Sequence, residues 1–277
     1  MTVTLFDGKW NIECKWWTFP GGERNVQILG TLPKGRGAML TIVCPFKNSD
    51  SIIDVMLLND AIRHVNPEPH IRLVIPYFPA ARQDRVMNPG EPFALRVMAQ
   101  MINSCKFKEV EVWDPHSDVL PALFEPGVLT VRTQWDLWKD IIKTNHGEGG
   151  YAPNEKVLVS PDAGALKKIY KLAKETGISV VEATKQRDVK TGQIVNTQVD
   201  VNSLLKYNII YIVDDICDGG RTFIDLANVI REGGYVKKMV LCVTHGIFSR
   251  GLDPLSVFDK VYTINNMSTE NLSAFNI

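Results

Sequence analysis

The sequence contains few cysteines, no excess of either charge and no long apolar run. Its five cysteines are widely separated and form no Cys-x-x-Cys pair, which argues against a disulfide framework or a thiolate zinc site. Lysine plus arginine and aspartate plus glutamate both number 31, so the formal net charge of +0 provides no overall field for nucleic acid or a membrane surface. No apolar stretch approaches the roughly 20 residues that cross a bilayer, and the first residues lack a signal-peptide pattern. We therefore expect a cytoplasmic protein that stays in solution, without nucleic-acid or membrane partners.

Short β-branched apolar runs alternate with amphipathic stretches along the whole chain. The predicted strands cover residues 39–44, 71–75, 110–113, 157–160, 179–182, 209–213 and 239–243. The predicted helices cover residues 51–65, 93–105, 163–176 and 222–233. Continuous apolar strands separated by helices are typical of a mainly parallel sheet that is buried on both faces. The pattern therefore predicts an α/β protein.

The length of 277 residues favours two α/β units of similar size, with one large domain as the alternative. The segment at 144–153 is rich in glycine and polar residues, a composition that is typical of a connection. We place the boundary there, which gives an N-terminal domain over 1–145 and a C-terminal domain over 146–277.

The most informative segment, at 211–225, leads from an apolar run through two carboxylates and two glycines into a helix. Gly219 and Gly220 allow a tight turn whose N–H groups point inward, and the helix start near Thr222 adds its dipole, so a phosphate fits without a basic patch. Asp214 and Asp215 can accept hydrogen bonds from adjacent sugar hydroxyls. The segment therefore predicts a site for ribose 5-phosphate. The alternative is that the aspartates only cap and the glycines only turn the chain.

This strand-Val-Asp-Asp-Ile-x-Asp-x-Gly-x-Thr pattern resembles the phosphoribosyl-binding loop of type I phosphoribosyltransferases and of ribose-phosphate pyrophosphokinases. A segment of the first half distinguishes the two groups, because its Tyr-x-x-x-Ala-Arg-Gln-Asp run resembles the ATP-site signature of the pyrophosphokinases, which simple phosphoribosyltransferases lack. Within this run Arg82 can donate two parallel hydrogen bonds to phosphate oxygens, and Gln83 offers a hydrogen-bond donor and an acceptor to the nucleotide. The resemblance implies an ATP site that contains Arg82, Gln83 and Asp84; the alternative is an exposed charged turn.

Two further segments of the first half resemble the same family. Asp114-Pro-His116-Ser-Asp118 is similar to the family's Asp-x-His-x-Asp segment at a strand end, which implies that His116 is a ligand for magnesium-ATP and takes part in catalysis. Phe19-Pro-Gly-Gly-Glu23 resembles the segment that holds adenine, often across a subunit contact. The resemblance implies that Phe19 stacks on the base and that Glu23 binds nearby. The family usually has Asp where this chain has Gly21.

Two segments of the second half are also similar to the family. Ser160-Pro-Asp-Ala-Gly matches a strand-end segment, which implies that Asp162 is a ligand for the metal near the ribose. Thr184-Lys-Gln-Arg-Asp resembles the family's Asp-Lys-Arg-Arg, whose Lys-x-Arg pair lies on a mobile catalytic loop. The resemblance implies that Lys185 and Arg187 lie over the transferring group and offset its developing charge.

The resemblance implies two tandem type I phosphoribosyltransferase-like domains, each a mainly parallel sheet flanked by helices. The implied reaction is Mg²⁺-dependent transfer of the diphosphoryl group of ATP to the anomeric 1-hydroxyl of ribose 5-phosphate, giving phosphoribosyl pyrophosphate and AMP. The implied ribose-phosphate contacts are Asp214, Asp215, Asp218, Gly219, Gly220, Arg221 and Thr222. A homo-oligomer, a dimer or a hexamer, is expected because the adenine site is shared between subunits in the family. The sequence has no Walker-type loop, which argues against an ordinary P-loop kinase.

The sequence departs from the family at two places. Arg221 occupies a position where a small residue is usual, and a guanidinium there can bind a second phosphate. A larger acceptor is therefore the alternative substrate, for example the terminal ribose of ADP-ribose in NAD salvage. The segment after Arg85, residues 86–92, lacks the family's Lys/Arg-rich stretch, which predicts less positive charge near ATP. A phosphoribosyltransferase, which releases pyrophosphate instead of AMP, and a non-catalytic regulator are the two rival functions.

Overall fold

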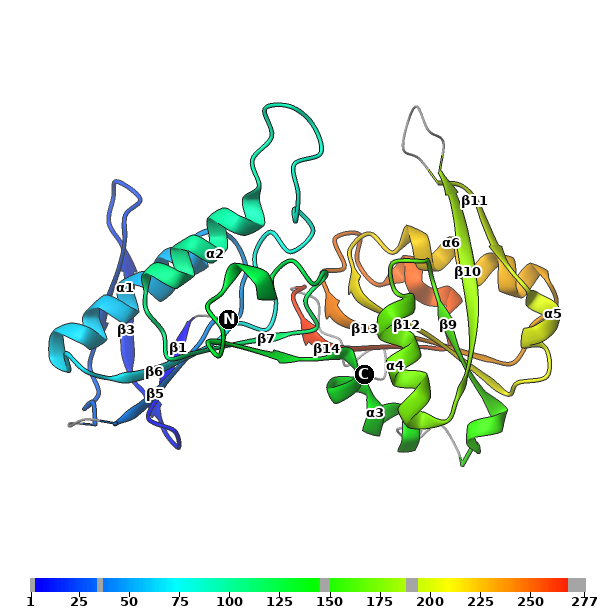
Figure 1. Ribbon diagram of the computed structural model, residues 1–277, viewed down its shortest axis with the longest axis horizontal. Helices are drawn as coiled ribbons and strands as arrows, with labels where there is room; N and C mark the ends of the chain where they lie inside the picture. Colours follow the sequence, from blue (N-terminus) through cyan, green and yellow to red (C-terminus); the bar gives the residue numbers. More distant parts are fainter. Residues whose placement is uncertain (1–2, 34–36, 145–149, 188–193, 269–277) are drawn as a thin grey trace. The chain divides into compact units, whose positions relative to one another are not determined.

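The computed structural model describes residues 3–33, 37–144, 150–187 and 194–268, with the side chains of 185–187 and 194–196 excepted. The chain divides into two compact units, Met1–Arg132 and Thr133–Ile277. Each unit contains a six-stranded sheet, and a separate two-stranded hairpin belongs to the first (Figure 1). Among the helices of the described residues, none combines the length and the apolar character that crossing a bilayer requires.

The first unit consists of a mixed sheet with helices between its parallel strands. Its elements are β1 (Thr4–Phe6), β2 (Asn11–Ile12), β3 (Cys14–Thr18), β4 (Arg24–Ile28), β5 (Met39–Val43), α1 (Asp50–Val65), β6 (His70–Val74), α2 (Ala94–Ser104), β7 (Glu109–Trp113), η1 (Pro121–Leu123) and β8 (Leu129–Arg132). The strand order is β2-β1-β5-β6-β7-β8, in which β5 to β8 are parallel and β1 is antiparallel to both of its neighbours. The predicted parallel strands β5, β6 and β7 are therefore confirmed. The sequence did not predict the parallel strand β8 or the short antiparallel strands β1 and β2.

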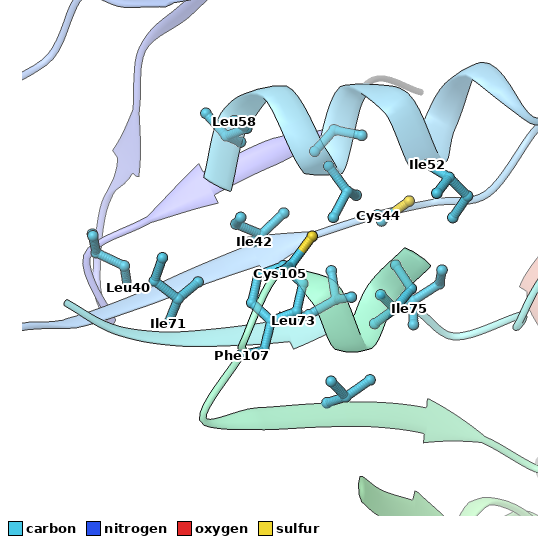
Figure 2. Close-up of a cluster of buried hydrophobic side chains, with 14 of the residues drawn as sticks. Leu40, Ile42, Cys44, Ile52, Leu58, Ile71, Leu73, Ile75, Cys105 and Phe107 are labelled. Atoms are coloured by element: carbon cyan, nitrogen blue, oxygen red, sulfur yellow. The ribbon is translucent and has the colours of Figure 1, made fainter. Parts of the chain in front are cut away.

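Helix α1 covers the parallel core of the first unit with its apolar face. Figure 2 shows Leu58 on this helix above Ile42 and Ile71 of the strands, and Ile52 at the other end of the helix beside Cys44. All of these side chains are at most 1% exposed. Fully burying one such side chain contributes about 1.5–3 kcal/mol, so this face fixes the helix on the sheet. The carboxyl ends of β6 and β7 are thereby held in place for the loops that follow them.

The second unit repeats the α/β alternation. Its elements are α3 (Gln134–Thr144), η3 (Pro153–Glu155), β9 (Lys156–Ser160), α4 (Leu166–Thr176), β10 (Ser179–Arg187), β11 (Ile194–Val199), α5 (Val201–Leu204), β12 (Ile209–Cys217), α6 (Arg221–Glu232), β13 (Lys238–Gly246), η4 (Asp253–Val257) and β14 (Lys260–Asn266). The strand order is β11-β10-β9-β12-β13-β14, and every pair is parallel except β10 with β11. The predicted fold class, two mainly parallel sheets flanked by helices, is confirmed.

Helix α3 belongs to the second unit, whereas the sequence-based boundary placed residues 133–145 with the first. Trp138 of α3 is fully buried and donates from its indole N–H to Thr244 Oγ1 of β13 at 3.0 Å. The ammonium group of the buried Lys156 donates to the carbonyl oxygens of Ile142 and Lys143 at the end of this helix. These contacts attach α3 to the second sheet, although the glycine-rich composition that guided the boundary begins only after the helix.

Tyr211, in the centre of β12, provides a test of packing in the second unit. Its side chain is 1% exposed, and its hydroxyl has no hydrogen-bond partner among the described residues. A buried hydroxyl without a partner has a desolvation cost, so we expect Tyr211→Phe to leave the free energy of unfolding unchanged or raise it by about 1–2 kcal/mol. The matched variant is Tyr235→Phe, because Tyr235 is equally buried but donates to Lys238 O at 3.1 Å; this variant should lose about 1 kcal/mol. Urea denaturation measures the free energy of unfolding of both variants. A larger loss of this free energy for Tyr211→Phe than for Tyr235→Phe would show that the Tyr211 hydroxyl has a partner.

Candidate active site

The parallel strands β9, β12 and β13 end at the same edge of the second sheet, and the candidate ribose-phosphate residues lie along this edge. Strand β12 continues past the predicted end at residue 213, because Asp214 pairs with Val243 and Ile216 pairs with His245 of β13. The two aspartates are therefore strand residues. Since successive side chains of a strand point to opposite faces, Asp214 and Asp215 leave the strand in opposite directions.

The two neighbouring aspartates have different surroundings. Asp215 is 6% exposed, and its carboxylate accepts a hydrogen bond from the Lys168 ammonium of α4 at 3.0 Å. Asp214 keeps some accessible surface, but desolvation raises the pKa of its carboxyl well above the usual value, and the nearby charge of Asp215 raises it further. Asp162 also raises this pKa, whereas Lys168 lowers it. The strand end thus concentrates negative charge that a cation or hydrogen-bond donors would stabilise.

Asp162 organises the loop between β9 and α4. Its Oδ1 accepts hydrogen bonds from the backbone N–H groups of Gly164 at 3.0 Å and Ala165 at 3.2 Å, and the Ser160 hydroxyl donates to its carbonyl oxygen at 2.8 Å. These bonds form a turn that leads directly into α4, the helix that carries Lys168. Asp162 therefore has a structural role in addition to the metal contact that the sequence predicts.

The predicted phosphate turn connects β12 to α6. Gly220 is the residue before the helix and has a left-handed backbone, with φ 74°, and a Cβ at this position would lie 2.9 Å from Leu255 Cδ2. Both the conformation and the space therefore require glycine. The helix begins at Arg221, and the Phe223 and Ile224 N–H groups both donate to Gly220 O at 3.0 Å. Gly219, Gly220 and the positive end of the helix dipole lie together, an arrangement that favours an anion.

Polar side chains surround this turn. Asp218 immediately precedes the two glycines and is partly buried, as is Thr222 in the first turn of α6. The Arg221 side chain is 67% exposed and forms only a loose pair with Asp225, with 3.6 Å between Nε and Oδ2. An exposed pair of this kind contributes little, so the Arg221 guanidinium can reorient towards a ligand.

Lys185 and Arg187 lie on β10, which pairs with β11 in a hairpin whose register places Lys185 opposite Thr197. The side chains of Lys185 and Arg187 are outside what the structure describes. Their predicted position over the transferring group therefore stays a prediction.

In the first unit, a pocket of about 620 Å³ contains four of the six predicted ATP-site residues. It is lined by Arg82, Gln83, Asp84, Arg85, Met87, Glu91, Pro92 and His116. The loops that follow β6 and β7 supply these residues, so two segments that are far apart in sequence meet at one place. The arrangement provides guanidinium, amide and imidazole groups along a single cavity.

Electrostatic contacts fix the inner wall of this pocket. Asp84 is 7% exposed and accepts two hydrogen bonds from the Arg85 guanidinium, at 2.8 and 3.1 Å. These bonds lower the pKa of Asp84 to about 2, and Ser117 and His116 contribute to the shift. Asp114, at the end of β7, is buried and has a φ of 38°, an unusual backbone for a non-glycine residue. This turn leads directly to His116.

The predicted adenine contacts, Phe19 and Glu23, lie in the turn of the β3–β4 hairpin and do not line the pocket. The turn is closed by the Phe19 N–H donating to Glu23 O at 2.8 Å, and the exposed Phe19 ring packs edge-on against Trp17. Arg24 of β4 attaches the hairpin to helix α1, because its guanidinium donates two hydrogen bonds to the Asp54 carboxylate. Phe19 and Glu23 are thus presented at the surface of the first unit.

The sequence did not single out two cationic residues at the second sheet's edge. Lys168 reaches Asp215 from a helix 47 positions earlier, and Arg250 lies against Gly219 from the loop after β13. Neither residue belongs to a motif. The surplus of carboxylates near 214 was the available signal that a cation should lie close to Asp215.

The carboxylates at this edge fit a magnesium ion that is also held by phosphate oxygens. Mg²⁺ is commonly bound through one or two carboxylates together with substrate phosphates and water. Asp162, the ligand that the sequence predicts, supplies such a carboxylate, and its charge raises the pKa of the neighbouring Asp214, a repulsion that a cation would relieve. Over the described ranges, no three or more His, Cys, Asp or Glu side chains are gathered in a way that could hold a metal ion.

Comparisons with known proteins agree over nearly the whole chain. A family model described as the N-terminal domain of ribose phosphate pyrophosphokinase matches residues 8–105, and one described as a phosphoribosyl transferase domain matches residues 135–271. The chain is 31% identical over 242 residues to a ribose-phosphate pyrophosphokinase of Pyrococcus abyssi, covering 87% of this chain and 78% of that protein. It is 30% identical over 266 residues to one of Pyrococcus furiosus, covering 94% and 87%.

The crystal structure of phosphoribosylpyrophosphate synthetase from Mycobacterium smegmatis has the same fold. The two structures align with a TM-score of 0.73 at 22% identity, covering 91% of this chain and 80% of that one.

Proposed function

The chain belongs to the ribose-phosphate pyrophosphokinase family, and on this premise we propose that it transfers the diphosphoryl group of ATP to the anomeric hydroxyl of ribose 5-phosphate, forming phosphoribosyl pyrophosphate and AMP. The observation that carries the proposal is that one chain contains two different sites. The first unit has the pocket of Arg82, Gln83 and His116, and the second has the carboxylate pair followed by the glycine turn. A simple phosphoribosyltransferase needs only the second.

In the second unit, the glycine turn and the first turn of α6 bind the 5-phosphate through backbone N–H groups and the Thr222 hydroxyl. Asp214 accepts hydrogen bonds from the ribose hydroxyls, while Asp215 is held by Lys168 and positions the strand end. In the first unit, Arg82 and Gln83 contact the nucleotide, and Arg85 holds Asp84 in its ionised form beside His116. The Phe19 ring and Glu23 are proposed to hold adenine in an oligomer, a dimer or a hexamer.

Transfer of a phosphoryl-type group depends mainly on alignment and charge compensation. The anomeric hydroxyl oxygen bonds to the β-phosphorus and its proton passes to solvent. The bond from that phosphorus to the α–β bridging oxygen breaks, and AMP leaves with that oxygen. Lys185 and Arg187 compensate the charge that develops in this step. Magnesium, when bound with ATP, would neutralise the phosphate oxygens, and His116 of the first unit is the residue proposed to hold it. In the second unit, Asp162 is proposed as a ligand for the metal near the ribose.

A larger acceptor, such as ADP-ribose, is the second candidate. It is supported by Arg221, whose long cationic side chain is mostly exposed at the phosphate turn. A compact sugar phosphate does not require a guanidinium at this position, because the backbone N–H groups already supply donors.

The test is to incubate the protein with magnesium-ATP and, in separate reactions, ribose 5-phosphate and ADP-ribose, and to identify all products by mass. We expect AMP to form together with an acceptor that has gained a diphosphoryl group. Formation of ADP would indicate transfer of a single phosphoryl group. Consumption of phosphoribosyl pyrophosphate and a base with release of pyrophosphate, without use of ATP, would indicate a phosphoribosyltransferase. The absence of any turnover would favour a non-catalytic regulator.

A further inference from the structure

A second arginine lies against the phosphate turn. A Cβ built on Gly219 would lie 3.3 Å from both Cδ and Nε of Arg250 and 3.6 Å from its Cγ. Gly219, unlike Gly220, does not have a left-handed backbone, and a larger residue there would displace the Arg250 side chain by a few tenths of an ångström. Arg250 is exposed, and the described part of the chain provides no ion pair for its guanidinium.

The backbone that carries Arg250 is fixed against the end of β12. The N–H groups of Ile247 and Phe248 both donate to Cys217 O, at 2.9 and 3.2 Å, and the Gly251 N–H donates to Phe248 O at 2.9 Å. The Phe248 ring is 3% exposed and fills the space where a Cβ of Gly246 would be. Phe248 also has a φ of 49°, which is costly for an aromatic residue and is sustained by these contacts. The backbone at Arg250 is therefore fixed beside the turn, while its side chain is exposed.

Two arginines thus belong to the surroundings of the turn: Arg250 lies against Gly219, and Arg221 is the first residue of α6. One phosphate is already served by the N–H groups of the turn and of the helix start. Within the described ranges, Arg221 pairs with Asp225 at 3.6 Å, and no acidic residue forms an ion pair with Arg250. Two guanidinium groups in addition to the N–H donors exceed what a single 5-phosphate requires. Arginine is suited to binding phosphate with two parallel hydrogen bonds.

We propose that Arg250, together with Arg221, forms a subsite for a second phosphate that is linked to the 5-phosphate of the acceptor. The inference therefore favours the second candidate acceptor, a ribose whose 5-position carries a diphosphate ester, as in a nucleoside diphosphate joined to ribose. This inference rests on the proposed role of the turn as the ribose-phosphate site. The fixed backbone of Arg250 lowers the entropy cost of binding, so this residue contributes specificity for the longer acceptor.

The experiment measures binding of ADP-ribose and of ribose 5-phosphate by calorimetry, without ATP, to the wild-type protein and to Arg250→Ala, Arg250→Lys and Arg221→Ala. The matched control is Lys174→Ala, which removes an exposed positive charge from the last turn of α4, whose start follows the strand edge that holds the site. We expect wild type to bind ADP-ribose more tightly than ribose 5-phosphate. Arg250→Ala should weaken binding of ADP-ribose about ten- to hundredfold, because one hydrogen bond to a charged group is lost. Binding of ribose 5-phosphate should weaken much less. Arg250→Lys should recover only part of this loss, and Lys174→Ala should bind both acceptors as wild type does.

Several outcomes would overturn the subsite. Equal losses for both acceptors would mean that Arg250 binds the 5-phosphate itself, and no loss for either would remove it from the site. A wild type that binds ADP-ribose no more tightly than ribose 5-phosphate would also contradict the proposal. Inorganic phosphate provides a further arm: if it tightens binding of ribose 5-phosphate and this effect is lost in Arg250→Ala, the second phosphate is a free ion and not part of the acceptor.

Failure of the subsite and failure of the proposed reaction are distinguishable. AMP release by the wild-type protein is measured separately and tests the reaction. AMP release with unchanged acceptor binding in Arg250→Ala would refute the subsite alone. Selective loss of ADP-ribose binding without AMP release would refute the pyrophosphokinase reaction and leave the subsite supported.

Discussion

Asp214→Asn is expected to lower kcat/KM for the acceptor at least about a hundredfold while raising the free energy of unfolding at neutral pH. The loss follows from the removal of a charged acceptor for two sugar hydroxyls, since each hydrogen bond to a charged group contributes about 1.5–3 kcal/mol. The gain in stability follows from the raised pKa of Asp214, because desolvation and the neighbouring Asp215 make its ionised form unfavourable in the folded protein. Turnover assays and urea denaturation of the same variant measure the two effects.

The effect of Asp214→Asn on stability should depend on pH in one direction. The pKa of Asp214 is higher in the folded than in the unfolded protein, so the folded state binds the proton more tightly. The cost of ionising Asp214 is therefore absent below the unfolded pKa and complete above the folded one. We expect the stability advantage of Asp214→Asn to disappear as the pH falls through this window. An advantage that persists at low pH would mean that ionisation of Asp214 is not its cause.

Asp215→Asn is the matched variant, because it changes the adjacent carboxylate in the same way. It replaces the carboxylate that lies 3.0 Å from the partly buried Lys168 ammonium with a neutral amide, which removes the charge attraction of this pair. We expect this variant to lose stability, in contrast to Asp214→Asn. Equal effects of the two substitutions on stability would show that the two side chains do not have the different surroundings described here.

Lys185→Ala is expected to lower turnover at least about a hundredfold with little change in KM for ATP or acceptor. This is the order of magnitude for the loss of one group that stabilises charge only in the transition state. Circular dichroism should show an intact fold, because the β10–β11 hairpin is held by its backbone ladder. The control is Gln198→Ala, an exposed position of the same hairpin, which should keep normal turnover. Near-normal turnover of Lys185→Ala would remove this residue from the mechanism.

The inner parallel strands of both sheets were predictable because they are continuous apolar runs flanked by amphipathic helices. The parallel edge strands β8 and β14 were not predicted. The end of β12 was not predictable, because two carboxylates and an aspartate that precedes two glycines interrupt the apolar pattern. In the structure, the ladder with β13 continues as far as Cys217 opposite Gly246. Tertiary pairing therefore overrides the local preference of charged residues for a loop. The short strands before residue 30 were missed because they lack a sustained alternation.

The pocket of the first unit was largely predictable, since Arg82, Gln83, Asp84 and His116 lie in recognisable segments and meet in one cavity. Lys168 and Arg250 were not predictable. Their importance depends on contacts with Asp215 and Gly219, which are far from them in sequence. A lone lysine on an amphipathic helix and a lone arginine in a turn have no local pattern that separates them from solvated surface residues.

The most direct test of the account uses ATP that is radiolabelled at its β-phosphorus, supplied with magnesium and each phosphorylated ribose in turn. We expect the label to appear in the acceptor and the AMP that is released to be unlabelled. Label that appears in ADP would contradict the transfer of a diphosphoryl group. Label that stays in ATP while the acceptor is converted would contradict it as well.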